Sequence, residues 1–195
     1  MFRLLMTRAV AMADNLYALR QDLLDPTVFY ADDLLTHSID PGFLKEVTRS
    51  FASSGFGRVP AVDAILAPAI SGIPVGVSFA HLLDIRCIVA RKEVGIACRG
   101  PFIHTSAVSY TGKREVSLSV SERQFAGVRS VLLVDDFIST GSACIGLLNL
   151  CNQIGIRAER AAVVFAKPSQ GGCQRLASEG TEVWAYRNIE APVLG

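Results

Sequence analysis

Residues 131–143 read Val-Leu-Leu-Val-Asp-Asp-Phe-Ile-Ser-Thr-Gly-Ser-Ala, and they constrain the fold more than any other stretch of the chain. The four apolar residues predict a strand that is buried on both faces, as in a parallel sheet. Asp135 and Asp136 follow where this strand would emerge, before a turn of small residues and a helical pattern. A strand, a loop and a helix N-terminus in this order form an anion site, because backbone N–H groups and the helix dipole face the loop.

The adjacent carboxylates of Asp135 and Asp136 favour a ligand with hydroxyl groups or a bound metal ion. A sugar phosphate would satisfy both the carboxylates and the anion site. An apolar strand that ends in Asp-Asp also opens the receiver domains of response regulators, which need a phosphoacceptor Asp on a later strand. No Asp follows Asp136 in this chain, so the remaining alternative is a strand end with only a structural role.

The segment 131–143 resembles the phosphoribosyl-pyrophosphate (PRPP) motif of the type I phosphoribosyltransferases, including both acids, Thr140 and Gly141. Phe137 replaces the usual aliphatic residue, and Ala143 stands where many members carry a phosphate-binding Thr. Both departures resemble the xanthine phosphoribosyltransferase branch. The resemblance implies that Asp135 and Asp136 are catalytic and hold the ribose hydroxyls or, directly or indirectly, a Mg²⁺ ion. It implies that five loop residues bind PRPP: Ser139, Thr140, Gly141, Ser142 and Ala143.

The rest of the chain alternates predicted strands and helices, which indicates an α/β fold with a mainly parallel central sheet flanked by helices. A helix is expected from the N-terminus to about Leu24, and another begins at Asp40-Pro41. Alternating runs around 105–111 and 115–120 predict a hairpin with Gly112-Lys113 at its tip. The other expected strands are 64–68, 86–90, 131–134, 161–166 and 183–187, and the other expected helices end at Leu83 or span 142–153 and 170–179.

The composition excludes several classes of protein. Hydrophobic residues make up 50% and charged residues 19% of the 195 residues, which predicts one folded domain rather than a disordered chain. The net charge of +1, without blocks of like charge, argues against a nucleic-acid surface. No stretch is long and apolar enough for a membrane span. The N-terminal segment weakly resembles a signal peptide, but Arg3 and Arg8 interrupt its apolar stretch. Five scattered cysteines suit the reducing cytoplasm better than a disulfide framework.

A second anion loop is expected after strand 64–68, where the resemblance implies pyrophosphate binding by Ile70, Ser71 and Gly72. Small residues let backbone amides approach an anion, although they also make ordinary strand–helix turns. Arg91 and Lys92 follow the next strand, where relatives place a basic residue that reaches pyrophosphate, often across a dimer interface. An ordinary solvated pair at a strand end is the alternative. Lys113 and Arg114 fall at the tip of residues 98–118, which the resemblance implies to be a lid over the site, with an ordinary turn of solvated charges as the alternative.

Recognition of a purine base is implied by two further resemblances to the xanthine branch. Residues 29–41 resemble its base-binding hood, with Phe29, with Thr36 in place of the usual Asn, and with the matching His37. Lys167, in the segment 163–171, is implied to lie beside the 6-oxo group of the purine. A Lys donates hydrogen bonds but accepts none, so a 6-oxopurine is favoured over adenine, and xanthine moderately over hypoxanthine or guanine.

These features together predict a type I phosphoribosyltransferase fold in a single domain, residues 1–195. Its small base-binding hood is expected from about residues 1–41 plus the C-terminal segment, and its core from about 42–187. The implied function is purine salvage with PRPP and Mg²⁺, by a cytoplasmic homodimer that uses xanthine foremost. The alternatives are a hypoxanthine/guanine enzyme and a non-catalytic PRPP-sensing regulator of the same fold. Such regulators usually carry a DNA-binding domain, for which this chain has neither the length nor a basic face.

Overall fold

The computed structural model describes residues 7–10, 19–22, 29–31, 34–57, 61–92, 100–108 and 115–189. The backbone alone is described at residues 7–10, 19–22, 29–30, 57, 106–108 and 115–116. Among the described residues, no helix has the length and apolar character needed to cross a membrane.

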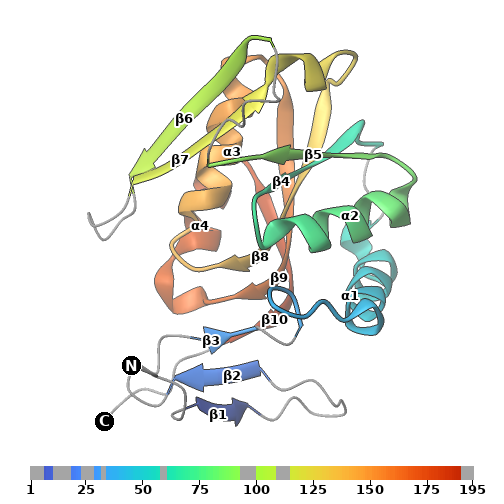
Figure 1. Cartoon of the computed structure of the whole chain (residues 1–195), viewed down its shortest axis with the longest axis vertical. Coiled ribbons are helices and arrows are strands. Elements are labelled where there is room, and N and C mark those ends of the chain that lie inside the picture. Colours follow the sequence, from blue (N-terminus) through green and yellow to red (C-terminus); the bar gives the residue numbers. More distant parts are fainter. Residues whose placement is uncertain are drawn as a thin grey trace.

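A five-stranded parallel sheet forms the centre of the molecule, in the order β10-β9-β8-β4-β5 (Figure 1). All five expected strands are present, and β8 and β9 begin or end several residues beyond the predicted apolar runs. The strands are β4 (Ala64–Pro68), β5 (Arg86–Ala90), β8 (Ser130–Ile138), β9 (Arg157–Ala166) and β10 (Glu182–Asn188). β4 is buried throughout, as its uninterrupted apolar sequence predicts for an inner parallel strand.

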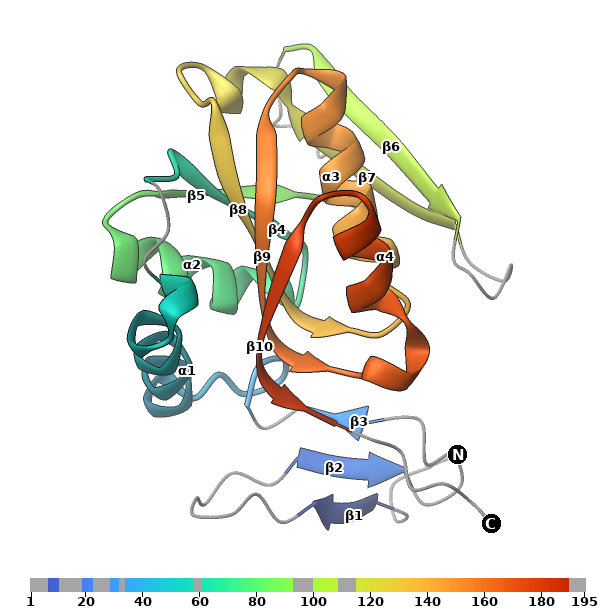
Figure 2. The same cartoon turned by 180° about the vertical axis from the view of Figure 1, so that it is seen from behind.

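Helices cover both faces of this sheet (Figure 2). They are α1 (Pro41–Ser53), α2 (Gly72–Leu83), α3 (Ser142–Gln153) and α4 (Gly172–Ser178). Side chains of α1 and α2 pack on one face with Leu132, while those of α3 and α4 pack on the other with Leu133. Successive residues of β8 therefore point to opposite cores, and the expected α/β architecture is confirmed.

The predicted antiparallel hairpin is present as β6 (Phe102–Val108) and β7 (Glu115–Ser121), with β6 beginning three residues before the expected run. It joins the edge of the sheet after β5, where the backbones of Arg91 and Ser119 exchange two hydrogen bonds of 2.8 and 2.7 Å. Gln153 of α3 donates a hydrogen bond to the backbone oxygen of His104, at 3.0 Å. The hairpin is thereby held against both the sheet and α3. Short 3₁₀ turns, Gly55–Gly57, Glu122–Phe125 and Pro168–Gln170, complete the described elements.

The expected N-terminal helix is wrong. Residues there form β1 (Thr7–Val10), β2 (Leu19–Asp22) and β3 (Phe29–Tyr30), which pair in a small antiparallel sheet. Helix propensity is a weak guide, and pairing between strands satisfies the same backbone groups that a helix would satisfy. Ala31, Leu34 and Leu35 follow this sheet and pack in one cluster with Phe165 and Ile189 at the carboxyl ends of β9 and β10.

Candidate active site

Asp135 and Asp136 lie near the carboxyl end of β8, with only 4% and 8% of their surface exposed. Each carboxylate accepts a hydrogen bond from the backbone N–H of the next residue, at 2.9 Å for Asp135 and 2.8 Å for Asp136. Burial, and then the charge of Asp136, raise the pKa of Asp135 well above its usual value, and Lys92 opposes this effect. The fold thus holds two adjacent acids at the carboxyl ends of the strands. Their desolvation costs free energy, which ligand contacts would offset.

The 139–143 loop, residues Ser139 to Ala143, connects these acids to α3. The loop turns at Gly141, whose φ of 78° lies in the left-handed region that glycine tolerates best. The hydroxyl oxygens of Thr140 and Ser142 lie 2.9 Å apart. A cavity of about 150 Å³ opens here, lined by residues 137–144, so the structure brings all five predicted residues around one small space at the α3 N-terminus. This arrangement suits a phosphate group.

The 69–72 loop, between β4 and α2, lies directly beside the acidic pair. A Cβ atom added to Gly72 would meet Asp135 Oδ1 at 3.0 Å and Pro68 Cδ at 2.7 Å, so this position has no room for a side chain. The Ala69–Ile70 peptide bond is cis. Ile70 is 85% exposed, and Gly72 begins α2, whose first N–H groups lack partners within the helix.

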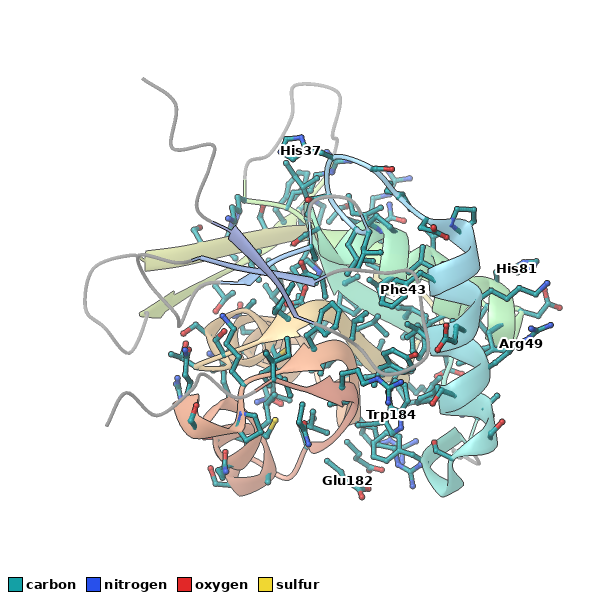
Figure 3. All side chains as sticks on the ribbon, turned by 90° about the horizontal axis from the view of Figure 1, so that it is seen from below. His37, Phe43, Arg49, His81, Glu182 and Trp184 are labelled. Atoms are coloured by element: carbon teal, nitrogen blue, oxygen red, sulfur yellow. The ribbon has the colours of Figure 1, made fainter. Side chains whose placement is uncertain are left out.

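A larger cavity of about 670 Å³ joins three distant parts of the chain. Thr36 and His37 come from the segment before α1, Ile70 and Ser71 from the 69–72 loop, and Arg91 and Lys92 from the end of β5. Ala69 completes the described lining. Figure 3 labels His37, which is an exposed residue of the segment before α1. If Arg91 and Lys92 were only a solvated pair at a strand end, they would not need to share a cavity with two other parts of the chain. A pyrophosphate site does need such a shared cavity.

The predicted base-binding residues are only partly brought together. Thr36 lines the larger cavity, whereas the Nζ atom of Lys167 lies 5.6 Å from the centroid of the Phe137 ring, beside the 139–143 loop. The backbone N–H of Lys167 donates to the oxygen of Ile138 at 2.9 Å, which fixes its place at the sheet edge. Only the backbone of Phe29 is described, so its role stays a prediction. Of the expected lid, the hairpin strands are described, while Lys113 and Arg114 lie outside the described residues.

Reasoning from sequence did not single out two residues of this site, Gly172 and Arg175, and it noted Phe137 without giving it a place in the site. Phe137 departs from the family pattern, and that departure is a signal, because its ring lies under Lys167 and contacts the Phe165 ring with centroids 4.9 Å apart. Arg175 Nη1 donates to the oxygen of Thr140 at 2.9 Å, and the N–H of Gly172 donates to the oxygen of Ser139 at 2.9 Å. Neither contact has a sequence signal, because more than thirty residues separate the partners.

The donor set fits a magnesium ion that arrives with a phosphate ligand. The described residues contain no group of three or more His, Cys, Asp or Glu side chains that could hold a metal ion. Asp135 and Asp136 nevertheless stand side by side next to both anion loops. Mg²⁺ usually keeps several waters and is bound by one or two carboxylates plus substrate phosphates, rather than by a cage of protein ligands.

Comparisons with known proteins agree with this geometry. No family model matches the chain. The chain is 30% identical to the xanthine phosphoribosyltransferase of Macrococcus caseolyticus over 173 residues, which cover 87% of this chain and 86% of that relative. It is 29% identical over 175 residues to the xanthine phosphoribosyltransferase of Pseudomonas syringae, covering 87% and 88% of the two chains.

Solved structures show the same fold at lower sequence identity. The adenine phosphoribosyltransferase of Thermoanaerobacter pseudethanolicus superposes with a TM-score of 0.65 at 17% identity, covering 94% of this chain and 96% of that chain. The APRTase of Giardia lamblia, solved with 9-deazaadenine, superposes with a TM-score of 0.68 at 18% identity, covering 94% and 93%. At these identities the likeness establishes the fold and leaves the base open.

Proposed function

This chain belongs to the xanthine phosphoribosyltransferase family, and we propose that it transfers the phosphoribosyl group of PRPP to a 6-oxopurine, with xanthine foremost. The products are the nucleoside 5′-monophosphate and pyrophosphate, so the enzyme serves purine salvage. The observation that carries this proposal is the cavity in which Thr36 and His37 meet the 69–72 loop, Arg91 and Lys92. Base, ribose and pyrophosphate must meet in one space for this reaction, and this cavity adjoins the acidic pair.

Each part of PRPP has a counterpart in the site. The 139–143 loop holds the 5′-phosphate through its backbone N–H groups and the hydroxyls of Thr140 and Ser142. Ile70, Ser71 and Gly72 hold pyrophosphate through backbone groups, and Arg91 and Lys92 add positive charge. Asp135 and Asp136 accept hydrogen bonds from the ribose hydroxyls between these two loops.

Electrostatic stabilisation accounts for the chemistry that these residues provide. The bond from the ribose C1 to the pyrophosphate oxygen breaks, and its electron pair leaves with pyrophosphate. A purine ring nitrogen then forms the new bond to C1, and its proton passes to the departing pyrophosphate. Positive charge develops on the ribose ring, and the fixed carboxylates of Asp135 and Asp136 stabilise it. Mg²⁺, held by the same carboxylates and by substrate oxygens, supplies neutralising charge to the pyrophosphate when it is bound.

Base selection rests on Lys167, Thr36 and Phe29 in this proposal. Lys167 donates a hydrogen bond to the 6-oxo group and repels the 6-amino donor of adenine. Thr36 offers one hydroxyl toward the 2-position, where the relatives' Asn would offer both a donor and an acceptor. Phe29 contributes an aromatic surface to the hood.

A substrate panel tests the proposal directly. The purified protein is assayed with PRPP, Mg²⁺ and each of xanthine, hypoxanthine, guanine and adenine. We expect turnover of the 6-oxopurines, led by xanthine, and no turnover of adenine. Preference for hypoxanthine or guanine would assign the chain to the alternative specificity, and PRPP binding without turnover of any base would indicate a sensor rather than an enzyme.

We also propose that the enzyme is a cytoplasmic homodimer of single-domain chains, each with a hood (about 1–41 plus the C-terminal segment) on a core (about 42–187). The four cysteines in the described part of the chain are free thiols, as suits a reducing compartment. Support for the dimer comes from α2, because three of the four large exposed apolar side chains found among the described residues lie on or just before it: Ile70, Val77 and Leu82.

A further inference from the structure

The 139–143 loop is held from behind by the start of α4. Four successive backbone oxygens, from Ile138 to Gly141, each accept a hydrogen bond from a protein group. The donors are Lys167 N to Ile138 at 2.9 Å, Gly172 N to Ser139 at 2.9 Å, Arg175 Nη1 to Thr140 at 2.9 Å, and Ile145 N to Gly141 at 2.8 Å. Two of these four donors belong to α4.

The matching N–H groups are left for a ligand. Within the described part of the chain, no backbone oxygen accepts a hydrogen bond from the N–H groups of residues 140–143. An anion needs such N–H groups and is repelled by carbonyl oxygens, so a loop binds phosphate only if its carbonyl groups point elsewhere. The contacts with α4 occupy the oxygens of Ser139 and Thr140 on the side away from the ligand.

The start of α4 packs directly against the backbone of the 139–143 loop. A Cβ atom added to Gly172 would lie 2.4 Å from the oxygen of Ser139 and 2.6 Å from the nitrogen of Gly141. The backbones therefore touch, and Arg175 is the side chain that extends this contact to Thr140. Arg175 is only partly buried, so its guanidinium group can be changed without opening the hydrophobic core.

We propose that Arg175, with the backbone of Gly172, is the positioning residue that turns the 139–143 loop toward the 5′-phosphate. This inference rests on the proposed function, because it takes the loop to be the 5′-phosphate site. Arg175 acts through Thr140 and does not touch the reacting atoms. Its loss should weaken ligands that carry the 5′-phosphate and leave ligands of the 69–72 loop unaffected.

The experiment measures the dissociation constants of ribose 5-phosphate and pyrophosphate by isothermal titration calorimetry, in buffer with Mg²⁺. Arg175→Met keeps a good helix former but removes the donor, and Arg175→Lys keeps the charge without the planar fork. We expect Arg175→Met to weaken ribose 5-phosphate about tenfold, the effect of an unpaired carbonyl, and to change pyrophosphate less than about twofold. Arg175→Lys should be intermediate, and KM should rise for PRPP but not for the base.

Arg157→Met serves as the matched control, because Arg157 begins β9 at the opposite end of the sheet and should change neither ligand. Equal affinity of Arg175→Met and wild type for ribose 5-phosphate would overturn the inference, as would equal weakening of both ligands. Full recovery by Arg175→Lys would assign the effect to charge instead. If Arg175→Met does not fold, Arg175→Lys is compared with wild type instead. Weaker binding of ribose 5-phosphate alone would support the inference, and unchanged binding would overturn it. Failure of the wild type to bind ribose 5-phosphate would contradict the proposed function itself.

Discussion

At the scale of single residues, burying the carboxylates of Asp135 and Asp136 costs folding free energy that a purely structural role would not explain. Asp135 is almost wholly buried beside a second carboxylate, and both effects raise its pKa. Carboxylates in such a place destabilise the folded chain unless a ligand offsets the cost, as is common at functional sites. Their proposed contacts with the ribose ring would supply the reason to keep them.

The double variant Asp135→Asn/Asp136→Asn should therefore lose turnover without losing the fold. The amide groups still accept hydrogen bonds, but they lack the charge that stabilises the cationic ribose. Loss of one transition-state electrostatic contact costs about 10²–10³ in rate, and we expect at least that reduction in kcat. Thermal unfolding at neutral pH should show a variant at least as stable as wild type. Wild-type turnover in the folded variant would contradict the role of the pair.

Lys167→Ala should raise KM for a 6-oxopurine by roughly one to two orders of magnitude, because a charge-assisted hydrogen bond contributes about 1.5–3 kcal/mol. KM for PRPP should stay near the wild-type value. Steady-state kinetics with each substrate varied in turn measures both constants. Equal effects on base and PRPP would place Lys167 in general support of the sheet edge.

Thr36→Asn is the complementary change. It restores an amide toward the 2-position, so the ratio of kcat/KM for xanthine to that for hypoxanthine should rise, because hypoxanthine lacks the 2-oxo group. Thr36 lines the larger cavity. Competition assays with both bases measure the ratio, and an unchanged ratio would mean that the hood does not recognise the 2-position.

At the scale of elements, the sequence predicted what periodicity and local chemistry determine. The helix over 142–153 was predicted with the bounds that α3 has, and a hairpin was predicted where β6 and β7 pair, although its first strand was expected around 105–111. The N-terminal sheet was missed because its strands are short and depend on one another for pairing. Contacts such as Arg175 with Thr140 join residues far apart in sequence, and no local pattern encodes them.

Helix α2 approaches the sheet so closely that only glycine fits at position 76. A Cβ atom there would lie 2.8 Å from the Cβ of Ala67 and 2.9 Å from the Sγ of Cys87. Gly76→Ala should destabilise the fold by about 1–3 kcal/mol, because overpacking outweighs the gain of roughly 1 kcal/mol in helix propensity. Chemical denaturation measures the difference. Gly55→Ala is the control, since nothing lies within 4 Å of its added Cβ, and it should change stability by less than about 0.5 kcal/mol.

Asp63 ties the start of β4 to the start of β8. Its carboxylate accepts hydrogen bonds from the N–H groups of Arg129 and Ser130, at 2.8 and 2.9 Å, and these bonds lower its pKa below the ordinary 3.8. A lowered pKa means that the stabilisation is present above the unfolded-state pKa and is lost as the pH falls through the folded-state value. Asp63→Asn should therefore be less stable than wild type at neutral pH, with a gap that closes below about pH 4. Urea unfolding across this range tests the sign, and a gap independent of pH would refute it.

At the scale of the whole molecule, the candidate active site exists only because parallel strands bring their carboxyl ends to one edge. Segments near residues 36, 70 and 91 line one cavity there, and residues 137–144 line another beside it. The family motif predicted the second group from sequence, since its members are neighbours along the chain. Convergence of the first group follows from the strand order β8-β4-β5, which only the tertiary structure reveals.

The outer surface of α2 is the proposed contact between the two subunits of the homodimer. Val77 is 53% exposed and Ile70 is 85% exposed, next to the cavity that Arg91 and Lys92 line. Contact between two copies through α2 would cover these side chains, and in the proposed dimer each basic pair would complete the partner's pyrophosphate site. We expect light scattering to give the wild type a mass of about two chains, because a two-fold dimer is the commonest assembly that buries the same surface of both copies.

Val77→Glu places a charge in this proposed interface, and burying an unpaired charge strongly opposes association. We expect the variant to scatter as a monomer and to lose turnover, because Arg91 and Lys92 would no longer complete the neighbouring pyrophosphate site. Ala177→Glu adds the same charge on the exposed surface of α4 and should leave both mass and activity unchanged. A wild-type monomer with full activity would contradict the dimer, and a fully active Val77→Glu monomer would show that each subunit binds pyrophosphate with its own residues alone.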